Sequence, residues 1–365
     1  VSSTIGDGVN ISAVTFDVNA INRTSKPKLG ANEFSVLSAS GGLFDAAATH
    51  SETWVYNDTD ISIGRNVLIQ TIPVGTPVGH QAMIAFNDVG LYDTAKMDSG
   101  GAIGIAKAES FIYNDQNDAD ITIAQGTRLL SDETISLESK TIATADTEVI
   151  SKTYGLSGAA QGHSISRIDT SNNVALNGAR IESDEDVVIR AGYNNVLNAD
   201  AETRLYNRTA LPVETDPDAD ATITQDNRIS IAAYIPSVGT VPTGSSSDDQ
   251  INRAAIATIK DIYLQSGDGT HTTRGYGRGT DLYRELISNA AELFGANISL
   301  DITGGSTTDI SNSGVSVDGT LFAGTHYKQL LHIDNTGAIT LQSEGMADPG
   351  YRYDVDLARN IQQRI

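Results

Sequence analysis

The sequence predicts an all-β protein, and more specifically a parallel β-helix: a solenoid with corner insertions and one short flanking α-helix. Three observations support this prediction. Short runs of β-branched residues with a period of two recur along the whole 365-residue chain. One six-residue pattern occurs three times in the chain. Small residues dominate while aromatic residues are only 6% of the chain, which suits the narrow interior of stacked coils.

The short alternating runs predict strands with one buried face, because successive side chains of a strand point to opposite sides. Turn residues separate most of these runs, as at Asn177-Gly178 and Asp318-Gly319, where positive φ angles are needed. The expected strands are residues 61–63, 67–69, 121–123, 134–137, 187–189, 229–231, 261–264, 298–300, 315–317 and 339–341.

The repeated pattern is Glu, a hydroxyl residue, any residue, an apolar residue, Tyr and Asn, at 52–57, 109–114 and 202–207. Its uneven spacing argues against a propeller with blades of fixed length and favours coils whose corners accept insertions. We expect coils of roughly 20 residues that share one core and pair their backbones with the coils above and below. A pair of β-sandwiches is the alternative fold. Each copy precedes an expected acidic turn and a strand, the acidic segments being 58–60, 118–120 and 218–220.

Two segments depart from the strand pattern and set the expected organisation. Residues 236–249 carry two prolines and a Gly/Ser run, which predicts a loop. We therefore expect β-helical coils with insertions over 1–240, a loop excursion over 241–256, and further coils over 257–365 with a helix near 280–295.

The expected helix has Thr280 as its cap, Asp281 and Glu285 near its positive first turn, and Gly295 as its stop. An apolar stripe at helical spacing predicts that it lies against the solenoid and covers an edge or a flank. That stripe consists of Tyr283, Leu286, Ile287, Ala290 and Phe294.

Composition excludes several classes of function. The chain has 24 Lys and Arg against 46 Asp and Glu, a net charge of −22, so sequence-independent binding of nucleic acid or anionic lipid is not expected. Zero cysteines exclude disulfides and thiolate chemistry and fit an exported bacterial protein. We find no run long enough for a membrane span. Because Val1 replaces an initiator Met, we expect a processed or excised piece.

The one candidate metal site is the acidic run containing Asp216, Asp218 and Asp220. Carboxylates at alternate positions could bind Ca²⁺, although a solvated acidic turn is the favoured interpretation. No nucleophile, base or cofactor motif is visible. Residues 275–279 (GYGRG) precede the helix without a phosphate-loop Lys, and we interpret them as a flexible lead-in. We therefore expect no catalytic residues and no cofactor other than Ca²⁺.

Residues 195–212 (NVLNADAETRLYNRTALP) and 279–285 (GTDLYRE) resemble very large filamentous haemagglutinin-like bacterial adhesins, including leukotoxin-type ones. The likeness covers about residues 50–345. It implies a secreted right-handed β-helical fibre at the cell surface. The chain lacks an NPNG-type secretion motif, so the resemblance implies interior shaft and not the export-directing cap.

From these observations we expect a non-catalytic, extracellular structural or adhesive fibre. It would be either a shaft segment of a giant surface adhesin or a subunit that assembles into a filament. Expected partners are other copies of itself, end to end or laterally, and surface glycans or the surface of a host or neighbouring cell. The alternative is a secreted β-helical protein that binds or degrades polysaccharide.

Overall fold

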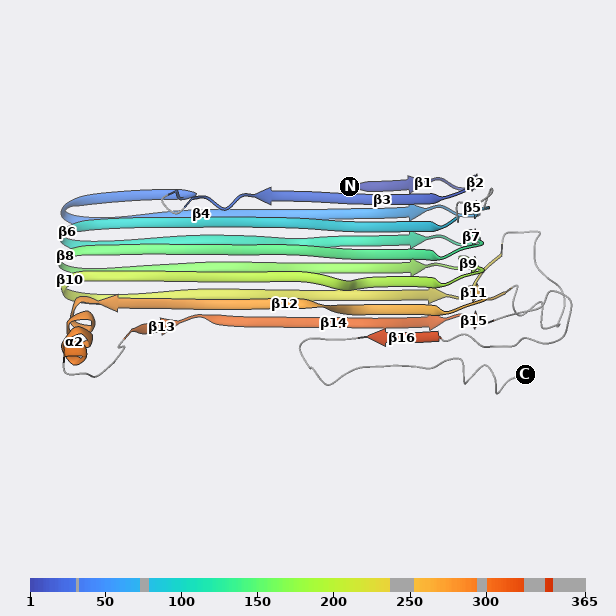
Figure 1. Ribbon diagram of the computed structural model, residues 1–365. Coiled ribbons are helices and arrows are strands. Elements are labelled where there is room, and N and C mark those ends of the chain that lie inside the picture. Colours follow the sequence, from blue (N-terminus) through green and yellow to red (C-terminus); the bar gives the residue numbers. More distant parts are fainter. Residues whose placement is uncertain (31–32, 73–78, 237–252, 294–300, 325–338, 344–365) are drawn as a thin grey trace, which may run out of the picture.

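A computed structural model describes residues 1–30, 33–72, 79–236, 253–293, 301–324 and 339–343. The described residues are nearly all in strands, with one helix, and this confirms the all-β prediction. The strands form two sheets, one of ten strands and one of six. Figure 1 shows long strands stacked in layers from the N-terminal to the C-terminal side, with the short strands of the six-stranded sheet gathered at one end.

Strands of very unequal length make up the ten-stranded sheet. Its longest members, β6, β8 and β10, have 43, 42 and 46 residues. The strands of this sheet are β1 (Ser2–Ile5), β3 (Phe16–Lys26), β4 (Val36–Ile63), β6 (Gln81–Ile123), β8 (Ile135–Leu176), β10 (Val187–Ala232), β12 (Ile262–Asp281), β13 (Ile302–Gly304), β14 (Ser306–Asp318) and β16 (Ile339–Ser343).

The six-stranded sheet contains only short strands, and it lies where the long strands begin and end (Figure 1). Asn177-Gly178 forms one of the expected turns into this sheet, and Gly178 has the positive φ that such a turn requires, 79°. The strands of this sheet are β2 (Asn10–Ala13), β5 (Leu68–Thr71), β7 (Arg128–Ser131), β9 (Arg180–Ser183), β11 (Ile256–Thr258) and β15 (Leu321–Ala323).

Pairing is parallel throughout the two sheets except between β12 and β13. Neighbouring long strands are in register over almost their whole length: Gln81 pairs with Ile135, and Ile123 pairs with Leu176. β8 and β10 continue the same register. The repeating unit is therefore more than 50 residues long, and the expectation of roughly 20 residues per coil is wrong.

Each of the longest strands folds back on itself halfway along (Figure 1). In β8, Thr141 Oγ1 donates to Asn172, 31 residues away, and Thr147 contacts Ser166, 19 residues away. Thr153 Oγ1 donates to the Ala159 carbonyl, 6 residues away. Separations that shrink toward residue 156 mean that the outgoing and returning halves face each other across a thin interior. We call the bend the tip and the opposite end, with the short strands, the base.

Apolar side chains at the base stack in columns that pass from strand to strand. One column is made of Ile61, Ile121, Val174, Ile229 and Val315, each paired with the next through the sheet register. The first four are almost fully buried. Because every second residue of each strand joins such a column, the alternation in the sequence becomes one continuous core.

Polar side chains occupy the interior between the base and the tip. Asn57 Nδ2 donates to Asn117 Oδ1 at 2.8 Å, and Asn172 Nδ2 donates to Asn227 Oδ1 at 2.9 Å. These buried amides find partners on the neighbouring strand, so strands continue through Asn-, Thr- and Ser-rich sequence. The expected strands outside 298–300 therefore coincide with strands, apart from the first residues 67, 134 and 261, but most of those strands are much longer than predicted. The acidic segments 58–60, 118–120 and 218–220 are strand and not turns.

The predicted helix exists as α2 (Leu282–Leu293). Asp281 caps it in place of Thr280, because Asp281 Oδ1 accepts a hydrogen bond from the Arg284 backbone N–H at 2.9 Å. α2 lies beside the tip, where Tyr283 Oη donates to the Ala210 carbonyl at 2.7 Å. Its apolar stripe is not buried as expected, since Tyr283, Leu286 and Ile287 are all exposed.

Several expectations fall on segments that the structure does not describe. The central part of the predicted loop excursion, 237–252, lies outside the described residues, and so do Phe294, Gly295 and the expected strand at 298–300. Residues 275–279, expected as a flexible lead-in, lie in the last part of β12, which ends at Asp281 before α2.

Candidate functional site

The outward side chains of the returning strand halves stack in columns, as the inward ones do. One such column contains His50, Glu109, His163 and Asp218, on β4, β6, β8 and β10 respectively. Histidines and acids alternate along it, and His50 Nδ1 lies 3.2 Å from a Glu109 carboxylate oxygen. The register of the sheet thus brings together groups that lie far apart in the sequence.

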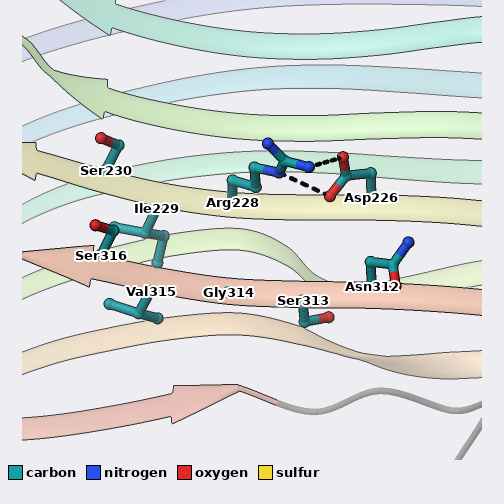
Figure 2. A pocket seen from close by; sticks show the side chains of 9 residues that line it. All are labelled: Asp226, Arg228, Ile229, Ser230, Asn312, Ser313, Gly314, Val315 and Ser316. Carbon is teal, nitrogen blue, oxygen red and sulfur yellow. Dashed lines mark hydrogen bonds and ion pairs between the residues drawn. The ribbon is translucent and has the colours of Figure 1, made fainter.

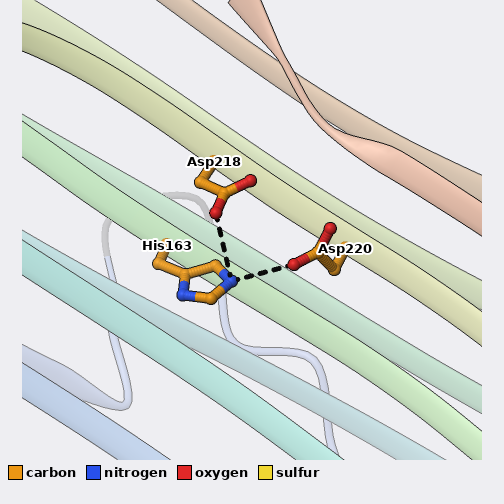
Figure 3. A group of neighbouring side chains, drawn as sticks. All are labelled: His163, Asp218 and Asp220. Atoms are coloured by element: carbon orange, nitrogen blue, oxygen red, sulfur yellow. Dashed lines mark hydrogen bonds and ion pairs between the residues drawn. The ribbon is translucent and has the colours of Figure 1, made fainter.

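His163, Asp218 and Asp220 are the one group of potential metal-binding side chains among the residues that the structure describes (Figure 3). His163 Nε2 lies 3.6 Å from Asp218 Oδ2 and 3.1 Å from Asp220 Oδ2. The His163 ring also packs edge-on against Phe111, with centroids 5.2 Å apart. Ser306 Oγ donates to the other oxygen of Asp220.

This geometry places two of the three predicted metal-site residues together. Asp218 and Asp220 point to the same side of β10 and meet His163, while Asp216 pairs in register with Gln161 and is not part of the group. One imidazole nitrogen and two carboxylate oxygens could hold a divalent ion. The imidazole suits Zn²⁺ or another transition metal better than the Ca²⁺ expected from the carboxylates alone.

An aromatic cluster lies on the same outward face, next to the His/Glu column. The Trp54 and Tyr113 rings stack with centroids 4.2 Å apart, and Tyr56 lies 6.3 Å from Trp54 in a nearly parallel plane. Phe111 contacts Tyr113 and lies edge-on to His50. Trp54 and Tyr56 are 50% and 60% exposed. Such exposure of large rings is a feature of recognition surfaces.

Four aspartates form a ladder farther along the same face. Asp58 pairs in register with Asp118, and Asp60 with Asp120. Partial burial and the neighbouring carboxylates raise the pKa of Asp120 to about 6, although Asn173 donates a hydrogen bond to it. Burial and its acidic neighbours raise the pKa of Asp118 as well.

A shallow hollow of about 600 Å³ lies where β14 joins β10 (Figure 2). Its only charged side chains are Asp226 and Arg228, which pair with each other at 2.7 Å. This pairing leaves neither charge directed at a ligand. The lining residues are Asp226, Arg228, Ile229, Ser230, Asn312, Ser313, Gly314, Val315 and Ser316.

The aromatic cluster is the site that the sequence interpretation missed. Trp54, Tyr56, Phe111 and Tyr113 all belong to the six-residue pattern, which was interpreted only as a structural repeat. The three copies are not equivalent. Copies 52–57 and 109–114 lie side by side but shifted by two residues, so that Trp54 pairs with Tyr113. Copy 202–207 pairs with 148–153, on the outgoing half of β8.

The chain matches no protein-family model and has no match among curated proteins or solved structures. Within the described part of the chain, no helix combines the length and the apolar character needed to cross a bilayer.

Proposed function

We propose that this chain is a non-catalytic structural segment of an extracellular adhesive fibre, built as a parallel β-helix with coils of more than 50 residues. The proposal rests on the register in which successive long strands pair. Long strands follow one another in chain order, pair in parallel, and keep the same columns of interior residues from β4 to β14. Such stacking makes a stiff body whose natural role is length and spacing.

The surface chemistry supports a structural role. A charge of −22 keeps separate rods apart in solution. Many outward charges pair along or between strands, for example Arg204 with Glu148 at 3.0 Å and Arg274 with Asp200 at 3.1 Å. The resemblance to filamentous adhesins agrees with this role and with placement at the cell surface.

End-to-end association is the second form of the proposal. Ile5 and Val317 are only partly buried, and they stand at the two ends of the interior column that contains Ile63 and Ile231. Among the described strands, β4 pairs with β6 along most of its length but with β1 only over residues 60–63. An incomplete column beside an unpaired strand edge is what a second copy or a further stretch of chain would cover.

A divalent cation is part of this proposal, with His163, Asp218 and Asp220 as its ligands. A bound cation would neutralise two of the acidic charges on the flank of the rod. It would also fix β10 to β8 through side chains in addition to the backbone pairing.

Negative-stain electron microscopy of the purified chain across a concentration series tests the proposal. We expect stiff rods at every concentration. Fibres with a regular axial repeat that appear only at high concentration would favour the assembling form, and rods of constant length would favour the shaft. Globular or flexible particles would contradict both.

A chelator series on the wild-type chain and on His163→Ala tests whether a bound cation stabilises the assemblies. Chelation should loosen assemblies of the wild type and leave those of the variant unchanged.

A further inference from the structure

We propose that Trp54 and Tyr56 form a platform that binds a neutral polysaccharide chain. This inference goes beyond the structural role, and it does not depend on whether the rods assemble. Three lines of evidence support it: the orientation of the two rings, the open edge of β4, and the charges around the rings.

The two rings lie side by side. Tyr113 covers one face of Trp54 at a centroid distance of 4.2 Å, so the plane of Trp54 lies across the stacking direction of the strands. Tyr56 is 13° from parallel to Trp54, with the centroids 6.3 Å apart. The two residues alternate along one strand, where positions i and i+2 lie about 7 Å apart, so the separation of the rings runs along the strand. Trp54 and Tyr56 therefore present neighbouring ring faces in one direction.

These ring faces point toward an edge of the sheet that no described strand covers. β6 pairs with β4 on the Tyr113 side, while on the other side β1 reaches only residues 60–63. Trp54 and Tyr56 keep half or more of their surface exposed. The C–H groups on the face of a pyranose ring are weakly positive, and they pack well on the negative face of an aromatic ring. A flat pair of rings suits two consecutive sugars of an extended chain.

The charges beside the rings select the class of sugar. Glu52 and Asp58 flank Trp54 and Tyr56 on the same outward side of β4, one at each end of the ring pair. Two described cations lie near these groups, and both are engaged. The Val1 ammonium donates to the Asp58 backbone carbonyl, and Arg167, two strands away, is held by Asp115 at 3.2 Å and by Asp169 at 3.8 Å. Carboxylates accept hydrogen bonds from sugar hydroxyls but repel uronate and sulfate groups. The platform therefore suits neutral glycans and not acidic ones.

Two other occupants are less well matched. A cationic ligand is bound best when rings surround it, whereas these two rings lie in nearly one plane. A second copy stacked on this edge would set Thr308 over Trp54, because Trp54, Tyr113, Arg167, Thr222 and Thr308 share one column. The same register sets the exposed Ile310 near Tyr56, so a second copy would cover Tyr56. It would place only a small threonine over Trp54, which gives no reason for a Trp at this position.

Trp54 is the only tryptophan of the chain, so its fluorescence reports directly on this surface. Acrylamide quenching of Trp54 fluorescence is measured at dilute protein with cellohexaose, laminarihexaose, maltohexaose and mannohexaose. We expect at least one of these to lower the quenching constant two-fold or more. Oligogalacturonate should leave it unchanged, and so should choline.

Variants identify the platform as the binding surface. In native affinity electrophoresis with the matching neutral polysaccharide in the gel, Trp54→Ala and Tyr56→Ala should weaken retardation at least ten-fold, and Trp54→Phe should restore most of it. Tyr276→Ala is the matched control, since Tyr276 is also an exposed ring but lies on β12. Unchanged circular dichroism and melting temperature show that each variant folds.

Three outcomes would overturn the inference. These are no protection by any neutral hexasaccharide, equal retardation of Trp54→Ala and wild type, and protection by choline alone. Loss of self-association in Trp54→Ala without any glycan binding would assign the platform to a second copy instead. Because rods are seen by microscopy independently of glycan binding, failure of this inference leaves the structural proposal standing, and the reverse also holds.

Discussion

The interior between the two halves of each long strand is filled differently at the base and at the tip. At the base, the short-stranded sheet holds the two halves of each long strand apart, and large aliphatic side chains such as Ile121 and Leu137 fill the space. At the tip the halves converge. The interior there contains small residues such as Ala106 and Ala108 together with Met97, and the chain passes through closely approaching glycines, among them Gly101 and Gly155.

Large apolar residues near the tip consequently point outward. Phe44 and Val213 are 74% and 75% exposed, and Leu43 and Leu156 are also exposed. The space between the halves, and not the hydrophobicity of the sequence alone, decides which side chains are buried. Stability should therefore depend on side-chain volume at the base and on backbone clearance at the tip.

The largest effect is expected at the base. Ile121→Ala removes a fully buried side chain from a column that runs through several strands, and should lower the free energy of unfolding by about 2–5 kcal/mol. Urea denaturation followed by circular dichroism measures it. Ile105→Ala is the matched control on the same strand near the tip, where Ile105 is exposed, and it should cost less than about 0.5 kcal/mol. Similar losses for both variants would contradict the difference between the two ends.

A smaller effect is expected from backbone clearance at the tip. Gly155 has a φ of 144°, and a side-chain Cβ there would overlap the Gly101 carbonyl oxygen. Gly155→Ala should therefore lower the free energy of unfolding by about 1–3 kcal/mol. Gly100→Ala is the control, because a Cβ at Gly100 meets no atom within 4 Å. If the two alanine variants have the same denaturation midpoint, clearance does not limit the tip.

The base could be predicted from the sequence more fully than the tip and the middle. Runs such as Ile121-Thr122-Ile123 show a clear contrast between apolar and polar positions, and all such runs that fall on described residues are strands. In residues 139–153 the inward positions are mostly small or hydroxyl residues, with Val149 as the one larger apolar side chain, and the outward positions mix polar residues with Ile142 and Ile150. Their inward Ser and Thr side chains are satisfied by partners on the facing half or the next strand, and local sequence does not reveal such partners.

The same limit applies to the candidate sites. Asp218 and Asp220 could be selected because they lie two residues apart, but His163 reaches them only through the register of β8 with β10. Trp54 and Tyr113 were recognised as members of a repeat, yet equivalent positions of that repeat do not pair. A sequence pattern identifies which residues face outward, whereas the coil length decides which of them meet.

The smallest effect concerns charge, on the outward face where the base begins. Partial burial and three neighbouring aspartates raise the pKa of Asp120 to about 6 in the folded protein, from an ordinary 3.8. The folded state therefore holds this proton more tightly than the unfolded state. The ionised Asp120 carboxylate therefore lowers the free energy of unfolding above pH 6. This destabilisation decreases as the pH falls from 6 towards 4, and it changes no further below that range. Asp120→Asn, which carries no charge, should raise the free energy of unfolding at pH 7.5 by about 1 kcal/mol after allowance for solvent screening. The gain should shrink at pH 4.5, and urea midpoints at the two pH values measure it.

Asp226→Asn, which removes an exposed charge paired with Arg228, should show no such gain at pH 7.5. An equal gain from Asp120→Asn at both pH values would mean that packing, and not charge, makes this aspartate unfavourable.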